Sequence, residues 1–248
     1  VPMYLSEKKN FSFNADEVLD LINEKTRLLI INNPQNPTGG LINKSEINKL
    51  VDGLKKFPNV VIFSDEIYSR QIYDGKSMPS FFYYPELYNR LIVMDGWSKT
   101  YAMTGWRLGW SVWPKGLIEN VTKMAINSYS CVSSANQIAA LAALEGPHEF
   151  LDDMMKKFDK RRNLIVDGLN SLPGIKCNKP GGAFYVFPNI SETGMTGEVF
   201  SEKCLFDAGV AIVPGTSFGQ SCSDFARFSF ANSYENIEKA LEKIKKIL

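Results

Sequence analysis

Apolar runs alternate with amphipathic segments over the first half of the chain. The runs at 26–31, 59–64, 91–94 and 108–113 predict strands. The first two are nearly continuous, which is typical of a strand buried on both faces. Segments 14–22 and 43–56 carry apolar residues at helical spacing, so we predict helices there. Strands that alternate with amphipathic helices predict an α/β architecture with a mostly parallel sheet.

The pattern changes after residue 113. Segments 115–128 and 135–145 predict helices, and a long amphipathic helix is expected from about 147 to 172. Short strands near 175–177, 183–187, 210–213 and 225–231, with helices near 197–207 and 234–248, predict a compact α+β unit. We therefore expect a large domain over residues 1–147 and a smaller carboxyl-terminal α+β domain over residues 148–248.

Composition narrows the function classes. The chain has 248 residues, is 44% hydrophobic and 22% charged, and has a formal net charge of +1. It has no long run of one charge sign and no apolar stretch of membrane-spanning length, which argues against a nucleic-acid or membrane partner. The four cysteines form no C-x-x-C pair, so they predict reduced thiols in a cytoplasmic protein.

A single histidine limits the available chemistry. His148 is the only one in the chain, and it stands where a helix is expected to start. No histidine-rich zinc site can be built, and a Ser–His–Asp triad would depend on this one residue. We expect no metal site, and we expect an enzyme of this sequence to move protons with another group.

Polar residues follow three successive predicted strands. Asn36 comes after the first, Asp65 and Tyr68 after the second, and Lys99 after the third. Each also has an ordinary alternative role. Asn36 could be a turn former, Asp65 a helix cap, Tyr68 a packing residue and Lys99 a surface lysine. The carboxyl ends of parallel strands lie along one edge of a sheet, where ligands of α/β proteins bind. Their convergence at that edge favours a functional site.

These residue types suit one cofactor. A lysine forms a Schiff base with an aldehyde, and a positive neighbour such as Arg107 favours this by lowering the lysine pKa. An aspartate such as Asp65 can hold a pyridine nitrogen protonated, while Tyr68 and Asn36 can hydrogen-bond a phenolate oxygen. A lysine Schiff base with an acidic partner on a pyridinium nitrogen is typical of pyridoxal phosphate sites.

Four motifs resemble one enzyme family in order and spacing. They are Asn-Pro-Gln-Asn-Pro-Thr-Gly at 33–39, Asp-Glu-Ile-Tyr at 65–68, Ser-Lys-Thr-Tyr-Ala-Met-Thr-Gly-Trp-Arg-Leu-Gly at 98–109, and Ala-Arg-Phe-Ser-Phe-Ala at 226–231. The chain is similar over its whole length to the class I/II aminotransferases, which are fold-type I pyridoxal phosphate enzymes of the aspartate aminotransferase superfamily. The resemblance implies a partial form of that fold.

The resemblance implies a role for each motif residue. Lys99 would carry pyridoxal 5'-phosphate as an internal aldimine and move the proton between the substrate and the cofactor. Asp65 would pair with the pyridine nitrogen, and Tyr68 and Asn36 would bind the phenolic oxygen; Lys99, Asp65 and Tyr68 form the catalytic set. The implied reaction moves the amino group of an L-amino acid to a 2-oxo acid.

The phosphate and the substrate are expected to meet other residues. The resemblance implies that Ser98 and Arg107 bind the phosphate, while Arg227, with Asn36, binds the substrate carboxylate. Either arginine could instead be a structural ion-pair partner. Gly96 departs from many relatives, which carry a hydroxyl residue there that contacts the phosphate. The family also suggests a cis bond before Pro37.

The resemblance also implies that the chain is shorter than a whole family member, and it leaves other functions open. Family members are longer, and Val1 lies in an expected strand, so we expect an amino-terminally truncated fragment with weak or no activity alone. The family implies a homodimer. A β-lyase on the same scaffold and a non-catalytic effector domain of a regulator remain alternative functions.

Overall fold

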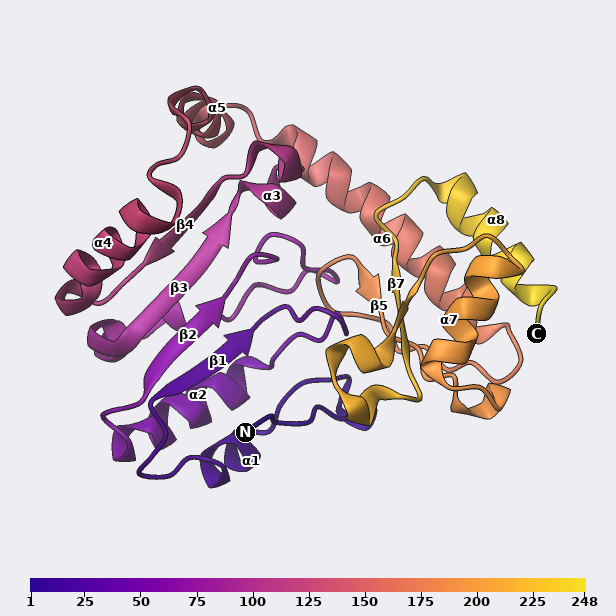
Figure 1. Ribbon diagram of the computed structural model, residues 1–248, viewed down its shortest axis with the longest axis horizontal. Coiled ribbons are helices and arrows are strands. Elements are labelled where there is room, and N and C mark those ends of the chain that lie inside the picture. The colour runs from indigo at the N-terminus through magenta and orange to yellow at the C-terminus, as the bar shows by residue number, and fades with distance from the viewer. The chain divides into compact units, whose positions relative to one another are not determined.

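The computed structural model describes residues 1–248, which divide into two compact units (Figure 1). The first unit comprises residues 1–34 and 42–151, and the second comprises residues 35–41 and 152–248. The chain therefore passes from one unit to the other three times. The short segment 35–41 belongs with the carboxyl-terminal unit, which the order of elements along the sequence does not predict.

A four-stranded sheet forms the centre of the first unit (Figure 1). Its strands are β1 (Leu28–Asn32), β2 (Val61–Asp65), β3 (Leu91–Gly96) and β4 (Gly109–Val112), in that spatial order. The first three run parallel, and β4 pairs antiparallel with β3. The predicted α/β fold with a mostly parallel sheet is confirmed.

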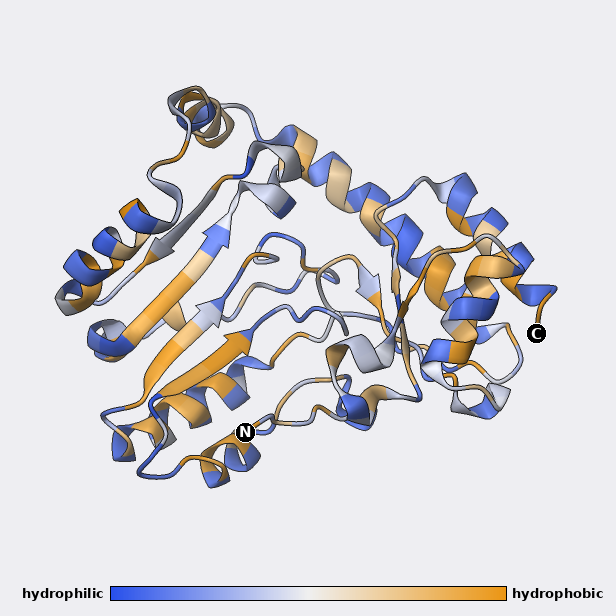
Figure 2. Ribbon diagram, viewed as in Figure 1, coloured by the Kyte–Doolittle hydropathy of each residue, from blue (hydrophilic) through white to orange (hydrophobic).

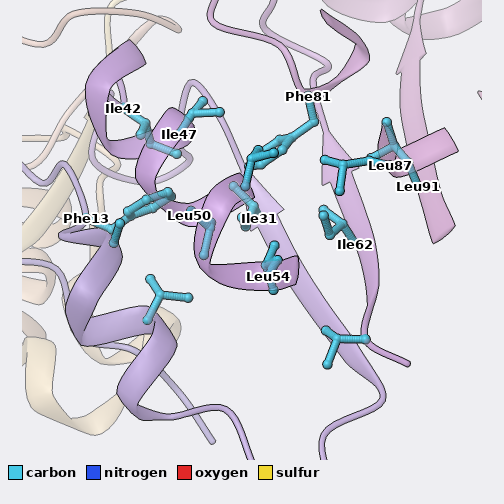
Figure 3. Packing of buried hydrophobic residues seen from close by; sticks show 14 of the residues in the cluster. Phe13, Ile31, Ile42, Ile47, Leu50, Leu54, Ile62, Phe81, Leu87 and Leu91 are labelled. Atoms are coloured by element: carbon cyan, nitrogen blue, oxygen red, sulfur yellow. The ribbon is translucent and has the colours of Figure 1, made fainter. Parts of the chain in front are cut away.

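Two helices cover one face of this sheet. They are α1 (Ala15–Asp20), capped by the Asn14 side chain, and α2 (Lys44–Gly53). Ile47 and Leu50 of α2 are fully buried and lie with Ile31 and Phe13 in one apolar cluster (Figure 3). Burial of such side chains contributes about 1.5–3 kcal/mol each, so this layer is a main source of the unit's stability.

The prediction that β1 is buried on both faces is wrong. Leu28 is 47% exposed and Ile30 is 67% exposed, whereas Ile31 is buried. Leu28 and Ile30 alternate along β1 with Leu29 and Ile31, which lie on the side that packs on the helices. No element of this unit covers the side of Leu28 and Ile30. Figure 2 shows the apolar character of β1 to β3 that produced the prediction. The strand expected within residues 1–5 is also absent, because these residues have no regular structure.

The remaining helices of the first unit precede or follow β4 in the chain. The short helix α3 (Trp97–Thr100) precedes β4, and α4 (Ile118–Tyr129) and α5 (Ser134–Glu145) follow it. All four residues of β4 are exposed, and α4 buries no residue. Short 3-10 turns lie at Glu7–Lys9, Leu54–Lys56, Phe81–Tyr83, Pro85–Arg90, Thr104–Trp106 and Lys115–Leu117.

The second unit contains a small antiparallel sheet. Its order is β5 (Tyr185–Val186), β7 (Ala226–Ser229) and β6 (Val213–Pro214), so β7 is central. The helices of this part of the chain are α6 (Glu149–Asn170), α7 (Gly197–Phe206) and α8 (Tyr234–Lys245). Short 3-10 turns lie at Ser191–Thr193, Gly215–Phe218 and Gln220–Cys222. No helix in either unit is long and apolar enough to cross a membrane.

The segment 35–41 is fixed to the second unit by main-chain contacts. Gly39 has φ +68°, and its carbonyl accepts hydrogen bonds from Gly181 at 2.9 Å and Gly182 at 3.0 Å. A Cβ at position 39 would lie 2.4 Å from Cβ of Pro180, so only glycine fits. The bond between Asn36 and Pro37 is cis, as expected, and the bond between Asn33 and Pro34 is also cis.

Candidate active site

Asp65 stands at the carboxyl end of β2, where the parallel strands end. Its side chain is half-buried, and Oδ1 accepts the amide of Ile67 at 3.2 Å. Burial raises the pKa of this carboxyl, and the Ile67 hydrogen bond opposes the shift. The turn that follows β2 therefore holds a carboxylate whose charge is poorly solvated. Such a group favours a positive partner.

Tyr68 lies in this turn and meets the predicted lysine. Its side chain is only 4% exposed, and Nζ of Lys99 lies 6.0 Å from the centroid of its ring. That distance is at the limit of a cation–π contact. The structure thus brings together Lys99 and Tyr68, two residues predicted from separate motifs.

Lys99 follows β3, as expected, but it lies on a short helix and not in a loop. It belongs to α3, which starts directly after β3 at Trp97. The indole nitrogen of Trp97 donates to the main-chain oxygen of Ala140 at 3.1 Å, which fixes this helix against α5. A short helix holds the lysine at a more defined position than an irregular loop would.

Gln71 is a residue that the sequence reasoning missed. It is 1% exposed, its amide nitrogen donates to the main-chain oxygen of Lys99 at 3.1 Å, and its main-chain N–H donates to the oxygen of Tyr68 at 2.8 Å. The side-chain oxygen is buried without a hydrogen-bond partner. Gln71 therefore ties the turn of Tyr68 to the helix of Lys99. A polar residue three positions after Tyr68 was the only signal for it in the sequence.

Two more carboxylates support the strand ends, and both were also missed. Glu66 is buried and accepts the hydroxyls of Ser64 at 2.8 Å and Ser80 at 2.9 Å. Asp95 accepts the hydroxyl of Ser69 at 2.8 Å, which fixes the turn that carries Tyr68. Burial raises the pKa of both carboxyls.

The predicted phosphate ligands both lie in the segment that joins β3 to β4. Ser98 is half-exposed on α3, and Arg107 is exposed, with a hydrogen bond from Nη1 to the main-chain oxygen of Thr104 at 3.0 Å. Gly96, which lacks the hydroxyl found in many relatives, has a steric reason to be glycine. A Cβ there would lie 2.8 Å from the main-chain oxygen of Leu108.

Asn36 and Arg227 meet within the second unit. Arg227 lies on β7 and Asn36 in the segment 35–41, and Nη1 of the arginine donates to Oδ1 of the asparagine at 2.8 Å. The structure thus joins two residues that are 191 positions apart in the chain. Because the partner of Arg227 is an amide and not a carboxylate, its positive charge is not neutralised and can attract an anion.

These side chains suit pyridoxal 5'-phosphate. The first unit provides a primary amine, a phenol that contacts it, and a half-buried carboxylate at a neighbouring strand end. An aldehyde, a phenolic oxygen and a pyridine nitrogen require these three groups. In the second unit, Nε of Arg227 is buried with no hydrogen-bond partner, which suits a carboxylate ligand.

Comparison with known proteins shows the class to which this chain belongs. The family model for class I and II aminotransferases matches residues 1–244, and the chain is a member of this family. Enzymes of the family use pyridoxal 5'-phosphate.

The individual proteins to which this chain is similar are named as aminotransferases. An aspartate aminotransferase of Pyrococcus abyssi is 38% identical over 250 residues, which cover 100% of this chain and 63% of the relative. One from Pyrococcus horikoshii is 41% identical, with coverages of 98% and 62%. The crystal structure of an aromatic aminotransferase from P. horikoshii superposes with a TM-score of 0.94 at 38% identity, over 98% of this chain and 65% of that one. The chain thus spans less than two thirds of the length of these relatives.

Proposed function

We propose that this chain carries the catalytic residues of a pyridoxal-phosphate-dependent aminotransferase, which moves the amino group of an L-amino acid to a 2-oxo acid. The observation that carries the proposal is the contact between the amine of Lys99 and the ring of Tyr68, just beyond the carboxyl ends of the neighbouring strands β3 and β2, the second of which ends at Asp65. Family membership supports the same conclusion.

The residues of the first unit act on the cofactor and on protons. Pyridoxal phosphate, when bound, supplies the electron-withdrawing ring that makes the substrate's α-hydrogen acidic. Lys99 would hold the cofactor's aldehyde carbon through Nζ, and the same amine, released when the substrate's amino group takes its place, would carry the α-proton. Asp65 would hold a proton on the pyridine nitrogen, because a poorly solvated carboxylate is stabilised by a positive partner. Tyr68 would orient the phenolic side of the ring.

The remaining predicted residues bind and orient. Ser98 and Arg107 would bind the phosphate, and Arg227 would bind the carboxylate of the substrate through paired N–H groups. The oxygen of the Asn36 amide accepts a hydrogen bond from Arg227, so its NH₂ group would be the donor to a phenolic oxygen. An arginine for an α-carboxylate selects amino acids and 2-oxo acids as a class.

Further properties belong to the whole protein. We propose residues 1–147 as the cofactor domain, residues 148–248 as the small domain, a homodimer as the assembly and the cytoplasm as the location; family membership and four free cysteines support these assignments. Because the chain spans about 63% of the length of its relatives, we expect it to have weak or no activity alone.

The test is a half-reaction with the cofactor, an amino acid and the 248-residue chain at high concentration. We expect the wild type to form some pyridoxamine phosphate, and Lys99→Ala to be slower by about 10²–10⁴-fold, because it loses the proton carrier. Lys115→Ala, which removes an exposed lysine on a 3-10 turn, is the control. Pyruvate with ammonia as products would identify a β-lyase. Equal rates for Lys99→Ala and wild type would refute the proposal.

A further inference from the structure

The guanidinium of Arg227 lies against two aromatic rings. Its Cζ is 4.6 Å from the centroid of the Tyr185 ring and 4.9 Å from that of Phe218. Tyr185 lies on β5 and Phe218 ends the 3-10 turn that follows β6. Because β5 and β6 are the two neighbours of β7, each side of the central strand contributes one ring to its arginine.

Other aromatic residues hold these rings in place. Phe187 meets Phe218 edge-on, with centroids 6.0 Å apart, and stacks on Phe225 at 5.0 Å. The ring of Tyr185 lies 4.6 Å from that of Phe184. Packed aromatic rings of this kind have few alternative rotamers. The surface on which the guanidinium lies is therefore fixed before any ligand arrives.

The hydrogen bonds of Arg227 leave it suited to an anion. One nitrogen, Nη1, donates to Asn36, while Nε is buried and has no partner. An unpaired buried donor lowers stability, and a ligand oxygen would remove that cost. A guanidinium binds a carboxylate in its own plane through two parallel N–H groups, and the edge that carries Nε is the one without a protein partner at that atom.

We propose that Tyr185 and Phe218 form an aromatic clamp that positions Arg227 for a carboxylate. They are positioning residues: the clamp holds the guanidinium plane, and Arg227 makes the bond to the ligand. The inference rests on the proposed function in one respect, which is that Arg227 binds the carboxylate of the substrate. Without the rings, the arginine would occupy more rotamers, and the carboxylate would bind more weakly.

The test measures carboxylate binding by the ligand-free chain, without cofactor or turnover. Maleate, an unreactive dicarboxylate, is titrated into the protein labelled with ¹⁵N-arginine, and the Arg227 Nε resonance is followed. We expect Phe218→Leu and Tyr185→Leu each to weaken maleate binding by about 5- to 20-fold, since each loses one cation–π contact. The Nε resonance should also show greater mobility in both variants.

Rescue variants separate positioning from general damage. Phe218→Tyr and Tyr185→Phe keep a ring and should bind maleate within about twofold of the wild type. Phe82→Leu, an exposed ring of the first unit that pairs with Tyr88, is the matched control and should bind as the wild type does. Arg227→Ala should abolish binding.

Three outcomes would overturn the clamp. They are wild-type affinity in both leucine variants, equal loss in the leucine and ring-preserving variants, or unchanged binding in Arg227→Ala. A chain that binds maleate as expected, but in which Lys99→Ala forms pyridoxamine phosphate as fast as the wild type, would contradict the proposed function and leave the clamp intact. The two proposals can therefore fail separately.

Discussion

The two groups of candidate residues are held in different ways. In the first unit, Asp65 ends a strand, Tyr68 lies in the turn after it and Lys99 lies on the short helix α3. Hydrogen bonds between side chains and the main chain, such as those of Gln71 and Ile67, fix this group. In the second unit, Arg227 stands on a short strand and is fixed by rings. The first arrangement suits groups that must move protons over short distances. The second suits a group that must bind one planar anion.

This difference predicts different kinetic effects. Changes in the first group should lower kcat, because they alter the chemical step. Changes around Arg227 should mainly raise KM, because they alter the binding of the ground state and the transition state alike.

After Lys99→Ala, the largest expected effect is that of Asp65→Asn. Asparagine can still accept the hydrogen bond from Ile67, so the fold should be retained, but the charge beside the pyridine nitrogen is lost. We expect kcat for the half-reaction to fall by about 10²–10³-fold, as for the loss of one preorganised electrostatic contact, with little change in KM. Asp52→Asn, an exposed carboxylate that pairs with Lys55, is the control. A change confined to KM would contradict the assignment of Asp65 to the chemical step.

A smaller effect is expected for Gly96→Ala, which tests the main chain beneath Lys99. The new Cβ would lie 2.8 Å from the oxygen of Leu108 and 3.0 Å from Cα of Gly109, so β3 and β4 must separate. We expect the free energy of unfolding to fall by about 1–3 kcal/mol in urea denaturation.

Gly109→Ala is the matched control, since the two glycines face each other in the ladder. A Cβ at position 109 would meet only the oxygen of Asp95, at an ordinary 3.5 Å. Equal destabilisation by the two variants would show that the close approach at Gly96 is not what requires glycine.

The smallest expected effect is the change that Glu66→Gln makes in the pH dependence of the free energy of unfolding. Burial raises the pKa of Glu66, so the folded protein retains a proton that the unfolded chain loses near its ordinary pKa of about 4.3. The free energy of unfolding of the wild type should therefore fall as pH rises from about 4.3 through the raised pKa. Asp65 and Asp95 contribute with the same sign.

Glutamine keeps an acceptor for Ser64 and Ser80 but binds no proton, so Glu66→Gln should lose less stability than the wild type as pH rises through this window. The difference should be about 1.4 kcal/mol for each pH unit that separates the folded pKa from the unfolded one. Urea denaturation at a series of pH values measures it, with Glu24→Gln, an exposed carboxylate, as the control. A steeper fall in Glu66→Gln than in the wild type would have the wrong sign for a buried acid.

Much of the first unit could be predicted because its signals are local. Each strand is a contiguous apolar run, and Asp65, Tyr68 and Lys99 follow strands directly, so order along the chain gave their places at the sheet edge. The exposure of Leu28 and Ile30 could not be predicted, since a run of aliphatic residues does not tell which side another element covers.

The second unit was less predictable because its contacts are distant in sequence. Arg227 was found from its motif, but its two rings come from β5 and from the turn after β6, in strands of only two residues. Such short strands carry no periodicity, and an aromatic residue beside a strand is typical of plain core. Gln71 was missed for a similar reason, since its partner is a main-chain oxygen 28 positions away.

The membership of segment 35–41 in the second unit has a practical consequence for dissecting the gene. No single cut can separate the two units, because this segment lies far upstream of the other residues of its unit. A carboxyl-terminal piece expressed alone would lack Asn36, the hydrogen-bond partner of Arg227, and the turn that packs on Gly181 and Gly182. Isolating that half intact would require a circular permutation or a grafted linker that carries the segment with it.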